Sequence, residues 1–472
     1  MNHGEGPRGR RIAELETRVR ELEAQLAAAL KLNEILLARL GLNSSNSSKP
    51  PSSDPPRTPK TTKRRGKGRK RKRGGQKGHP RHPRNMVPPE DVTRTVEHRP
   101  DECAHCDEPL SEKDCESNPT TRHQIVELPE IKPDVEEHQC FSATCGTCGW
   151  VTEAVLPDEV QRDVFGPRLK ALVGMLGGKY RISKRGMVEL LADLLHINVS
   201  LGSVPKMEKF VSAALAASHE EVRAHVQSSS ESHADETSWR ENKKKAWLWV
   251  ASTAQAVLFC IAIGRGKVHA KDLLGERYSG IVHTDRWRGY DWIDVERRQL
   301  CWSHLDRNFQ GVVDRGGPGK RFGQAMLKSA DTLFNHWHKY RTGKIQARTF
   351  RRRMERLRKR VRGRLKRYST SGIDHVESMC RDLLRLEPAM WTFVYEAGVV
   401  PTNNTAERDI RKGVMWRKVS FGTDSEAGSR FAERILTASE TCRKQERNLF
   451  SFLTQSCEAF QAGDSLPPLL PA

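Results

Sequence analysis

The sequence predicts a multidomain α/β protein, and three observations support this class. Its 472 residues correspond to about three domains at roughly 150 residues each. A heptad pattern near the N-terminus is followed by a long basic segment almost without apolar residues, so the chain begins with separate modules. After Ser230 the apolar pattern changes from helical to strand-like, and it becomes helical again near residue 300. Strands followed by a helix and a further strand indicate a mixed sheet with helices on its faces.

Residues 10–41 are predicted to form a coiled-coil dimerisation helix. Apolar residues recur at alternating spacings of three and four, with Ile12, Val19, Leu26, Asn33 and Leu40 at the a positions and Leu15, Leu22, Ala29 and Leu36 at the d positions. β-branched residues at early a positions, Leu at d and one Asn at a favour a parallel two-stranded coiled coil. The alternative is an amphipathic helix that packs on its own domain.

Positive charge is concentrated in two runs of a chain whose net charge is +22. The predicted disordered linker, residues 42–98, contains 14 Lys or Arg and no acid between Arg57 and Arg84. A second run, between Arg341 and Arg367, has 14 basic residues opposed only by Glu355. Such runs indicate contact with nucleic acid, although solvated basic faces without a ligand are the alternative. The first run has no apolar anchors, which disfavours a membrane.

Residues 99–155 are predicted to form a zinc finger. The pairs Cys103 with Cys106 and Cys145 with Cys148 are two C-x-x-C motifs with 38 residues between them, and four thiolates suit a tetrahedral zinc ion. Lower-ranked candidate ligands are His105, Cys115 and Cys140. The segment between the two motifs is expected to form strands. Reduced cysteines without metal are the alternative, because the absence of a signal peptide indicates a cytosolic, reducing compartment.

Residues 160–228 are predicted to be helical. They include two helices separated by a short turn, with Ser203 as the candidate cap of the second. This pair is either a DNA-binding helix-turn-helix or ordinary core packing.

Residues 229–450 are predicted to form the mixed α/β domain, followed by a C-terminal element at 451–472. Strands are expected at 231–240, 246–253, 256–263 and 281–287, with a helix near Ala270. The charge-free stretch from Ala246 to Gly264 is interrupted by polar residues at its middle, so two buried strands around a turn are favoured over a membrane span. A helical block with one apolar stripe follows: Phe350, Met354, Leu357, Val361 and Leu365.

Three acids stand at positions where they could converge. Asp235 and Asp285 are each expected to end a strand, and Glu407 is expected to open a helix. Phosphoryl transfer on DNA requires two divalent cations held by a few carboxylates. Each acid also has a structural interpretation, because an Asp after a strand is often a turn residue and Asn404 with Glu407 fits a helix capping box.

At these residues the sequence resembles the transposases of the insertion-sequence 66 family, of the TnpC type. The motifs are HADET, HTDRWRGY, CWSHLDRNF and TNNTAER, together with NSSNSSKPPSSD and GGQKGH in the linker. The resemblance extends over nearly the whole chain. It implies a DDE enzyme with a ribonuclease-H-like core interrupted by a helical insertion at about 312–398.

The resemblance also implies the roles of single residues. Asp235, Asp285 and Glu407 would be the catalytic, metal-binding triad with two Mg²⁺ or Mn²⁺ ions, beside one structural Zn²⁺. Cys301 and His304 match a C-x-x-H signature and would contact the metal-binding residues without binding the metal. The alternative for His304 is a purely structural role in the core.

The implied function is metal-dependent cleavage at transposon ends and strand transfer into target DNA. Its partners would be double-stranded DNA, a second copy of the chain or a higher oligomer, and helper proteins of the same element, with no membrane. The location would be the bacterial cytoplasm, at the nucleoid.

Two other functions are consistent with parts of the sequence. A catalytically inactive or domesticated dimeric zinc-containing DNA-binding protein would share the coiled coil, the basic linker and the zinc site, so only the three acids distinguish it. An RNA-binding module is disfavoured because only 6% of the residues are aromatic.

Overall fold

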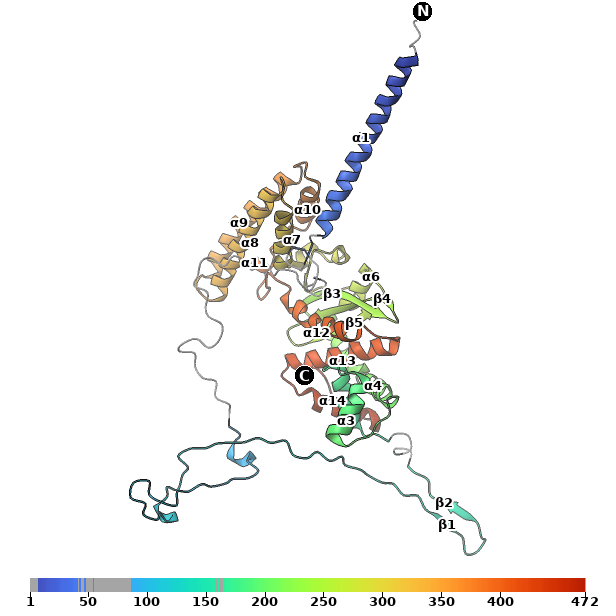
Figure 1. The fold of residues 1–472 in the computed structure, drawn as a ribbon, viewed down its shortest axis with the longest axis vertical. Coiled ribbons are helices and arrows are strands. Elements are labelled where there is room, and N and C mark those ends of the chain that lie inside the picture. The colour runs from blue at the N-terminus through green and yellow to red at the C-terminus, as the bar shows by residue number, and fades with distance from the viewer. Residues whose placement is uncertain are drawn as a thin grey trace, which may run out of the picture. The chain divides into compact units, whose positions relative to one another are not determined.

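The computed structural model describes residues 7–40, 42–43, 46–47, 54, 86–157, 160 and 164–471 (Figure 1). The basic run between Arg57 and Arg84 lies outside the described residues. The contacts divide the chain into two compact units. One unit combines residues 1–61, 136–193 and 197–472, and the other combines residues 62–135 with 194–196.

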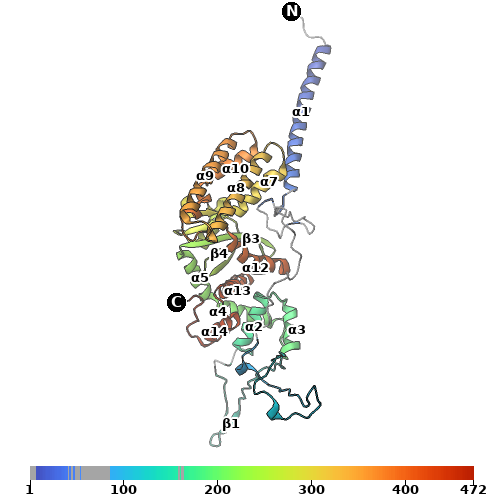
Figure 2. The ribbon, with the colours of Figure 1, turned by 90° about the vertical axis from the view of Figure 1, so that its left-hand side faces the viewer.

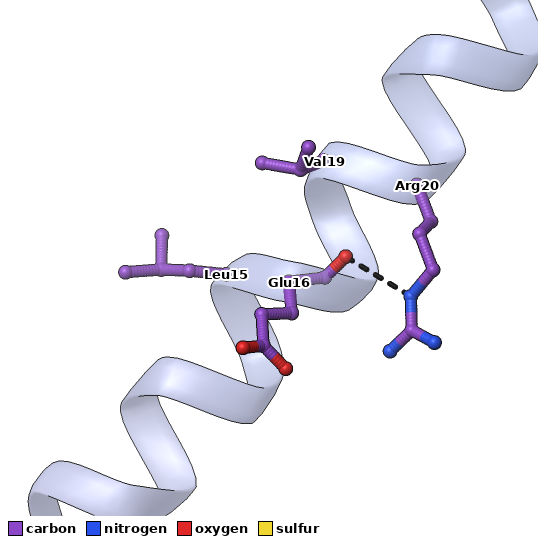
Figure 3. Close-up of a pocket in the computed structure, with 4 residues that line it drawn as sticks. All are labelled: Leu15, Glu16, Val19 and Arg20. Carbon is purple, nitrogen blue, oxygen red and sulfur yellow. Dashed lines mark hydrogen bonds between the residues drawn. The ribbon is translucent and has the colours of Figure 1, made fainter.

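The heptad segment forms one long helix, α1 (Pro7–Leu40). Leu15, Val19, Leu22 and Leu26 on its apolar stripe each expose about half or more of their surface. Leu15 and Val19 project from α1 beside an open hollow that Glu16 and Arg20 also line (Figure 3). The predicted helix is confirmed, and its pairing with a second copy stays a prediction.

Four helices cover residues 167–228: α2 (Pro167–Gly178), α3 (Lys184–Leu195), α4 (Ser203–Ala214) and α5 (Ala216–Ser228). The prediction that Ser203 caps a helix was wrong. Gly202 is the N-cap of α4, and Ser203 is its first residue. The backbone N–H of Ser203 donates instead to the Ser200 hydroxyl oxygen at 3.2 Å.

A five-stranded mixed sheet forms the centre of the larger unit. Its strands are β3 (Glu231–Glu241), β4 (Lys244–Ser252), β5 (Val257–Ala262), β6 (Ile281–Thr284) and β7 (Arg298–Leu300). They lie in the order β5-β4-β3-β6-β7. The pairs β3–β4 and β4–β5 are antiparallel, whereas β3–β6 and β6–β7 are parallel. Helix α6 (Lys267–Leu274) connects β5 to β6.

The charge-free stretch forms β4, a turn and β5, as predicted. Within the described residues, no helix is long and apolar enough to cross a membrane.

Three helices lie after residue 403: α12 (Asn404–Ser420), α13 (Glu426–Lys444) and α14 (Leu449–Ala462). Helix α13 lies along the outer edge of β5, where strand N–H groups would otherwise be unpaired. Side chains four residues apart on α13 accept these N–H groups: Thr441 from Val257, Thr437 from Phe259 and Glu433 from Ile261. The helix therefore closes this edge of the sheet.

The block between β7 and α12 is helical, as predicted: α7 (Trp302–Arg315), α8 (Lys320–Arg341), α9 (Ala347–Tyr368), α10 (Asp374–Arg385) and the short α11 (Thr392–Tyr395). Figures 1 and 2 show α7 to α10 gathered into one bundle. The predicted stripe on α9 is at most 3% exposed, and it belongs to a hydrophobic core separate from that of the sheet.

Candidate active site

Asp235 lies in the interior of β3 and not at its end, which corrects the prediction from sequence. The strand continues through Glu236, Thr237 and Ser238 because β4 pairs with it on one side as far as Glu241. Burial raises the pKa of Asp235 well above its usual range, and the charges of Glu236, Asp285 and Glu407 raise it further. The other two predicted acids therefore lie within electrostatic reach of Asp235.

Asp285 follows β6 directly, as predicted. Its carboxylate accepts the backbone N–H of Trp287 at 2.8 Å, and its carbonyl accepts a hydrogen bond from the Arg298 guanidinium at 2.9 Å. Arg298 is 1% exposed and also donates to Thr284 and Asp291. This buried arginine of β7 thus holds the loop that presents Asp285.

Glu407 lies in the first turn of α12, as predicted. Arg307 donates to its Oε1 at 3.3 Å, and His304 Nδ1 lies 3.2 Å from the same oxygen without the alignment of a hydrogen bond. Burial, and then the charge of Arg307, lowers the pKa of His304. Both partners come from α7, so this helix fixes the side chain of Glu407.

The capping-box interpretation of Glu407 was wrong. Helix α12 begins at Asn404, and its N-cap is Asn403. Glu407 is therefore the fourth helical residue, one position beyond the place that a capping box requires. Its side chain contacts α7 and is available for another role.

Asn403 is fully buried and joins several parts of the site. Its Nδ2 donates to the Ala234 carbonyl at 2.7 Å, and its Oδ1 lies 3.1 Å from His233 Nδ1. Its backbone N–H donates to the Cys301 sulfur at 3.2 Å. Burial, and then the charge of Glu407, raises the pKa of Cys301 to about 11, so this cysteine stays a thiol.

Glu236 adds a further buried carboxyl group next to Asp235. Its side chain is 2% exposed, accepts two hydrogen bonds from Arg265 and accepts one from the Tyr290 hydroxyl at 2.8 Å. Burial and the charge of Asp285 raise its pKa to about 7, against the opposing effect of Arg265 and Tyr290. Glu236 was not predicted from the sequence as a residue of the site, although it directly follows Asp235 in the chain.

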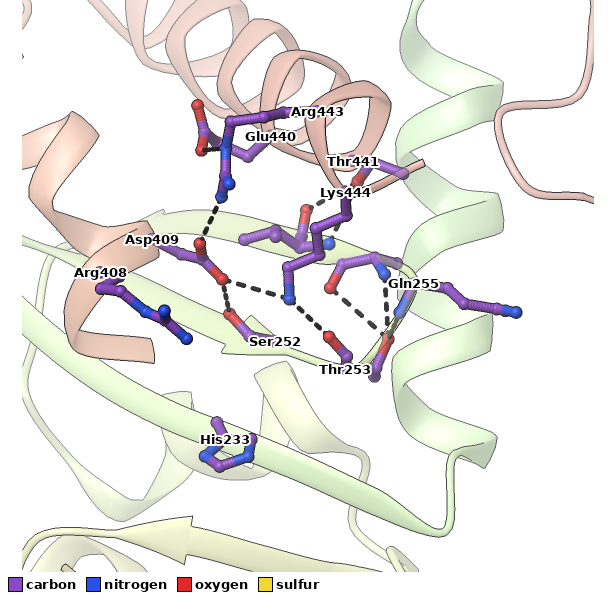
Figure 4. A network of polar contacts seen from close by, with 12 residues as sticks. His233, Ser252, Thr253, Gln255, Arg408, Asp409, Glu440, Thr441, Arg443 and Lys444 are labelled. Atoms are coloured by element: carbon purple, nitrogen blue, oxygen red, sulfur yellow. Dashed lines mark hydrogen bonds and ion pairs between the residues drawn. The ribbon is translucent and has the colours of Figure 1, made fainter. Parts of the chain in front are cut away.

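A buried polar network holds α12 against α13 and the sheet (Figure 4). Asp409, two residues after Glu407, is 2% exposed. It accepts hydrogen bonds from Ser252 at 2.9 Å and Arg443 at 2.8 Å, and Lys444 lies 3.3 Å from it. These contacts fix the helix that carries Glu407.

The donors in this region fit a divalent cation. Carboxylate oxygens are the ligands that Mg²⁺ and Mn²⁺ prefer. Burial raises the pKa of Asp235 most, the charges of Glu236, Asp285 and Glu407 raise it further, and a bound cation would offset both effects.

In the described residues, two groups bring three potential ligand atoms within 4.8 Å of one another, and Asp235, Asp285 and Glu407 together do not form such a group. The two groups are Cys301 with His304 and Glu407, and Glu231 with His233 and His283. Neither group contains Asp235 or Asp285.

The two cysteine pairs have the same local backbone. In each, the N–H of the fourth residue after the first cysteine donates to that cysteine's carbonyl, Asp107 to Cys103 and Gly149 to Cys145. Both of these residues have positive φ, at 57° and 73°. Hydrogen bonds within each loop lower the pKa of its first cysteine, for Cys145 to about 7. Each loop is therefore shaped to present thiolates to a metal.

The cysteine pairs fall in different compact units. Cys145 follows β1 (Ser142–Thr144) and begins the turn that joins it to β2 (Val151–Glu153) in a short hairpin. The prediction of strands between the pairs, at residues 121–140, was wrong, because this segment has no strand. Two prolines, Pro129 and Pro133, interrupt the segment and remove backbone donors.

Among known protein families, the transposase IS66 family matches residues 162–431, which are more than half of the chain and include all three predicted acids. The chain therefore belongs to this family, which confirms the resemblance of its motifs. A family of unknown function (DUF6444) matches residues 5–85, and no curated protein matches. Family membership makes the chain a nucleic-acid-processing enzyme with a function in transposition.

Proposed function

We propose that the chain is a DDE transposase that cleaves DNA at the ends of its element and joins the freed 3′-hydroxyl to target DNA. Asp235, Asp285 and Glu407 would be its metal-binding acids. The observation that carries the proposal is geometric: Asp285 follows β6, the parallel neighbour of β3, and Asn403 at the start of α12 donates to the Ala234 carbonyl beside Asp235 at 2.7 Å. The three acids come from β3, from the loop after β6 and from α12, up to 172 positions apart in the chain.

The strand order supports a ribonuclease-H-like core. The first strand of this sheet in chain order, β3, lies at its centre between the antiparallel β4 and the parallel β6. Asp235 on the central strand and Asp285 after its parallel neighbour lie at adjacent strands. The helical block from α7 to α10 would be the insertion that the family resemblance implies.

Two Mg²⁺ or Mn²⁺ ions would activate the attacking oxygen and stabilise the leaving oxygen of the phosphodiester. Asp235, Asp285 and Glu407 would hold these ions. His304 and Arg307 would orient Glu407 through the contacts at 3.2 and 3.3 Å.

The surface of α9 is proposed to contact the DNA backbone. Its apolar stripe is buried, which leaves exposed basic side chains on the opposite side: Arg351, Arg352, Arg356, Lys359, Arg360, Arg362, Lys366 and Arg367. Replacing Arg352, Arg356 and Lys359 with Gln should weaken binding to every duplex. The slope of log affinity against log salt should become shallower by up to about 0.9 per lost phosphate contact.

We further propose that α1 pairs in parallel with a second copy, which would cover its exposed apolar stripe. Replacing Leu15 and Leu22 with Glu should then dissociate the dimer in sedimentation experiments. One structural Zn²⁺ held by Cys103, Cys106, Cys145 and Cys148 is also proposed, on the spacing of the two C-x-x-C motifs in the sequence.

The reaction is tested by incubating the full chain with duplexes that carry the ends of its element, with Mg²⁺ or Mn²⁺. Nicked products with a 3′-hydroxyl, followed by joined products, are expected. Tight DNA binding without cleavage under either metal would instead identify a DNA-binding protein without catalysis.

A further inference from the structure

Two stacked histidines lie side by side on the strands that carry the acids. The parallel register of β3 and β6 places His233 opposite His283. Their ring centroids are 3.9 Å apart and the rings are inclined by only 20°. His283 is completely buried and His233 is 8% exposed, so both imidazoles are enclosed by protein.

A carboxylate faces both rings from the start of β3. Glu231 Oε1 lies 2.7 Å from His283 Nε2 and 3.8 Å from His233 Nε2. One ligand atom from each of the three residues lies within 4.8 Å of the other two. Two imidazole nitrogens and one carboxylate oxygen therefore converge on one point.

Asn403 determines which nitrogen of His233 faces this point. Because Asn403 Nδ2 donates to the Ala234 carbonyl, its Oδ1 is the acceptor that faces His233 Nδ1. The hydrogen bond at 3.1 Å requires a proton on Nδ1, which leaves Nε2 as the nitrogen that can bind a metal. A metal-binding histidine commonly donates its other N–H to an oxygen acceptor in this way.

We propose that Glu231, His233 and His283 bind one divalent transition-metal ion of the zinc type. Two imidazoles and one carboxylate favour such ions, whereas Mg²⁺ and Ca²⁺ prefer sites made only of oxygen. Three protein ligands leave room for water as the fourth. A cation between Glu231 Oε1 and the two Nε2 atoms would contact one ligand atom of each residue.

The position of this site indicates what the ion does. His233 and His283 each precede a predicted acid, Asp235 and Asp285, by two residues. Residues two apart on a strand project to the same side, so His233 and Asp235 share one side of β3, while Asp285 directly follows the strand that carries His283. The ion therefore fastens β3 to β6 next to the two aspartates and fixes their spacing. The binding of the ion does not depend on the cleavage reaction.

The test compares the metal content and cobalt spectrum of the full chain with those of two variants, Glu231→Gln and His283→Asn. After chelation and reloading with Zn²⁺, each variant should bind about one equivalent less than the wild type. With Co²⁺, the lost absorption should lack the thiolate charge-transfer bands that ligation by the cysteine pairs would produce. The control is His338→Asn, at an exposed histidine in the last turn of α8, which should bind as the wild type does.

A second measurement uses the wild type alone, in case the variants fail to fold. X-ray absorption at the zinc edge should show nitrogen and oxygen ligands in addition to sulfur. Equal metal content in the wild type and folded variants, or a zinc spectrum with sulfur ligands only, would overturn the proposal. The cluster would then be a pair of histidines that shares a proton with Glu231.

Discussion

Asn403 donates its side-chain amide to the backbone carbonyl of Ala234 at 2.7 Å, inside a fully buried contact. This bond ties the start of α12, which carries Glu407, to the strand that carries Asp235. The position of Glu407 relative to Asp235 therefore depends on the side-chain amide of Asn403.

Asn403→Ala should lower both stability and cleavage. It leaves the Ala234 carbonyl and His233 Nδ1 without this partner, and an unsatisfied buried polar group costs about 1–3 kcal/mol. Cleavage should fall roughly 10- to 100-fold because Glu407 is displaced. The neighbouring Asn404→Ala, at an exposed position, is the matched control in thermal unfolding and cleavage assays. Equal effects of the two variants would refute the positioning role.

The contribution of Glu236 to the stability of the metal-free protein should fall as pH rises from 5 to 7. The pKa of Glu236 is raised from 4.5 to about 7 in the folded state. A carboxyl group with a raised folded pKa stabilises the fold below its unfolded pKa, and this contribution is lost as pH rises through 7. The slope from this group is at most about 1.4 kcal/mol per pH unit.

Glu236→Gln should flatten this pH dependence, as measured by urea unfolding in the presence of a chelator. The exposed Glu276, which pairs with Lys271 at 3.1 Å, provides the control Glu276→Gln. An unchanged slope in Glu236→Gln would show that Glu236 is already ionised at pH 5.

Asp409→Ala should loosen α12 from α13 and the sheet. The substitution removes the acceptor of Ser252 and the partner of Arg443 and Lys444. The free energy of unfolding should fall by about 2–3 kcal/mol. This loss is smaller than for a fully buried ion pair because the Arg443 side chain is half exposed. Chemical denaturation measures it, and Asp464→Ala at the exposed end of α14 should change stability by less than about 0.5 kcal/mol.

Gly311→Ala should release the linker turn at Asn46. A Cβ at Gly311 would lie 2.2 Å from the Asn46 carbonyl oxygen, and Asn46 Nδ2 also donates to Asp314 at 3.1 Å. Hydrogen exchange of peptides that cover residues 43–47 should become faster in this variant. At Gly363 of α9 no neighbouring atom lies within 4 Å, so Gly363→Ala should leave this exchange unchanged and stabilise the helix by about 0.5–1 kcal/mol. Unchanged exchange in Gly311→Ala would show that the turn does not depend on this contact.

Periodicity predicted the parts of the fold that bury regular apolar patterns. The strands β4 and β5 and the stripe of α9 are of this kind. Strand β7 was missed because two of its three buried residues, Arg298 and Gln299, are polar. They are satisfied by tertiary hydrogen bonds, to Thr284 for Arg298 and from the Phe393 N–H for Gln299, which no local pattern reveals.

The acids of the candidate site were found through motif resemblance, whereas their supporting residues were not. Neither Asn403 nor Glu236 was predicted from the sequence to belong to the site. Their roles depend on contacts with residues 169 and 54 positions away. Only the folded chain brings these partners together.

The proposed catalytic role of Glu407 is tested most directly by measuring the cleavage of cognate element ends by Glu407→Gln. The matched control is Asp294→Asn, because Asp294 is exposed and Asn preserves its capping of the N–H of Glu296. Asp291 is unsuitable as a control since it pairs with Arg298 and Arg385. We expect that the cleavage rate of Glu407→Gln falls by at least about 100-fold while DNA binding and folding persist. Full cleavage by Glu407→Gln would contradict the assignment of Glu407 to the catalytic triad.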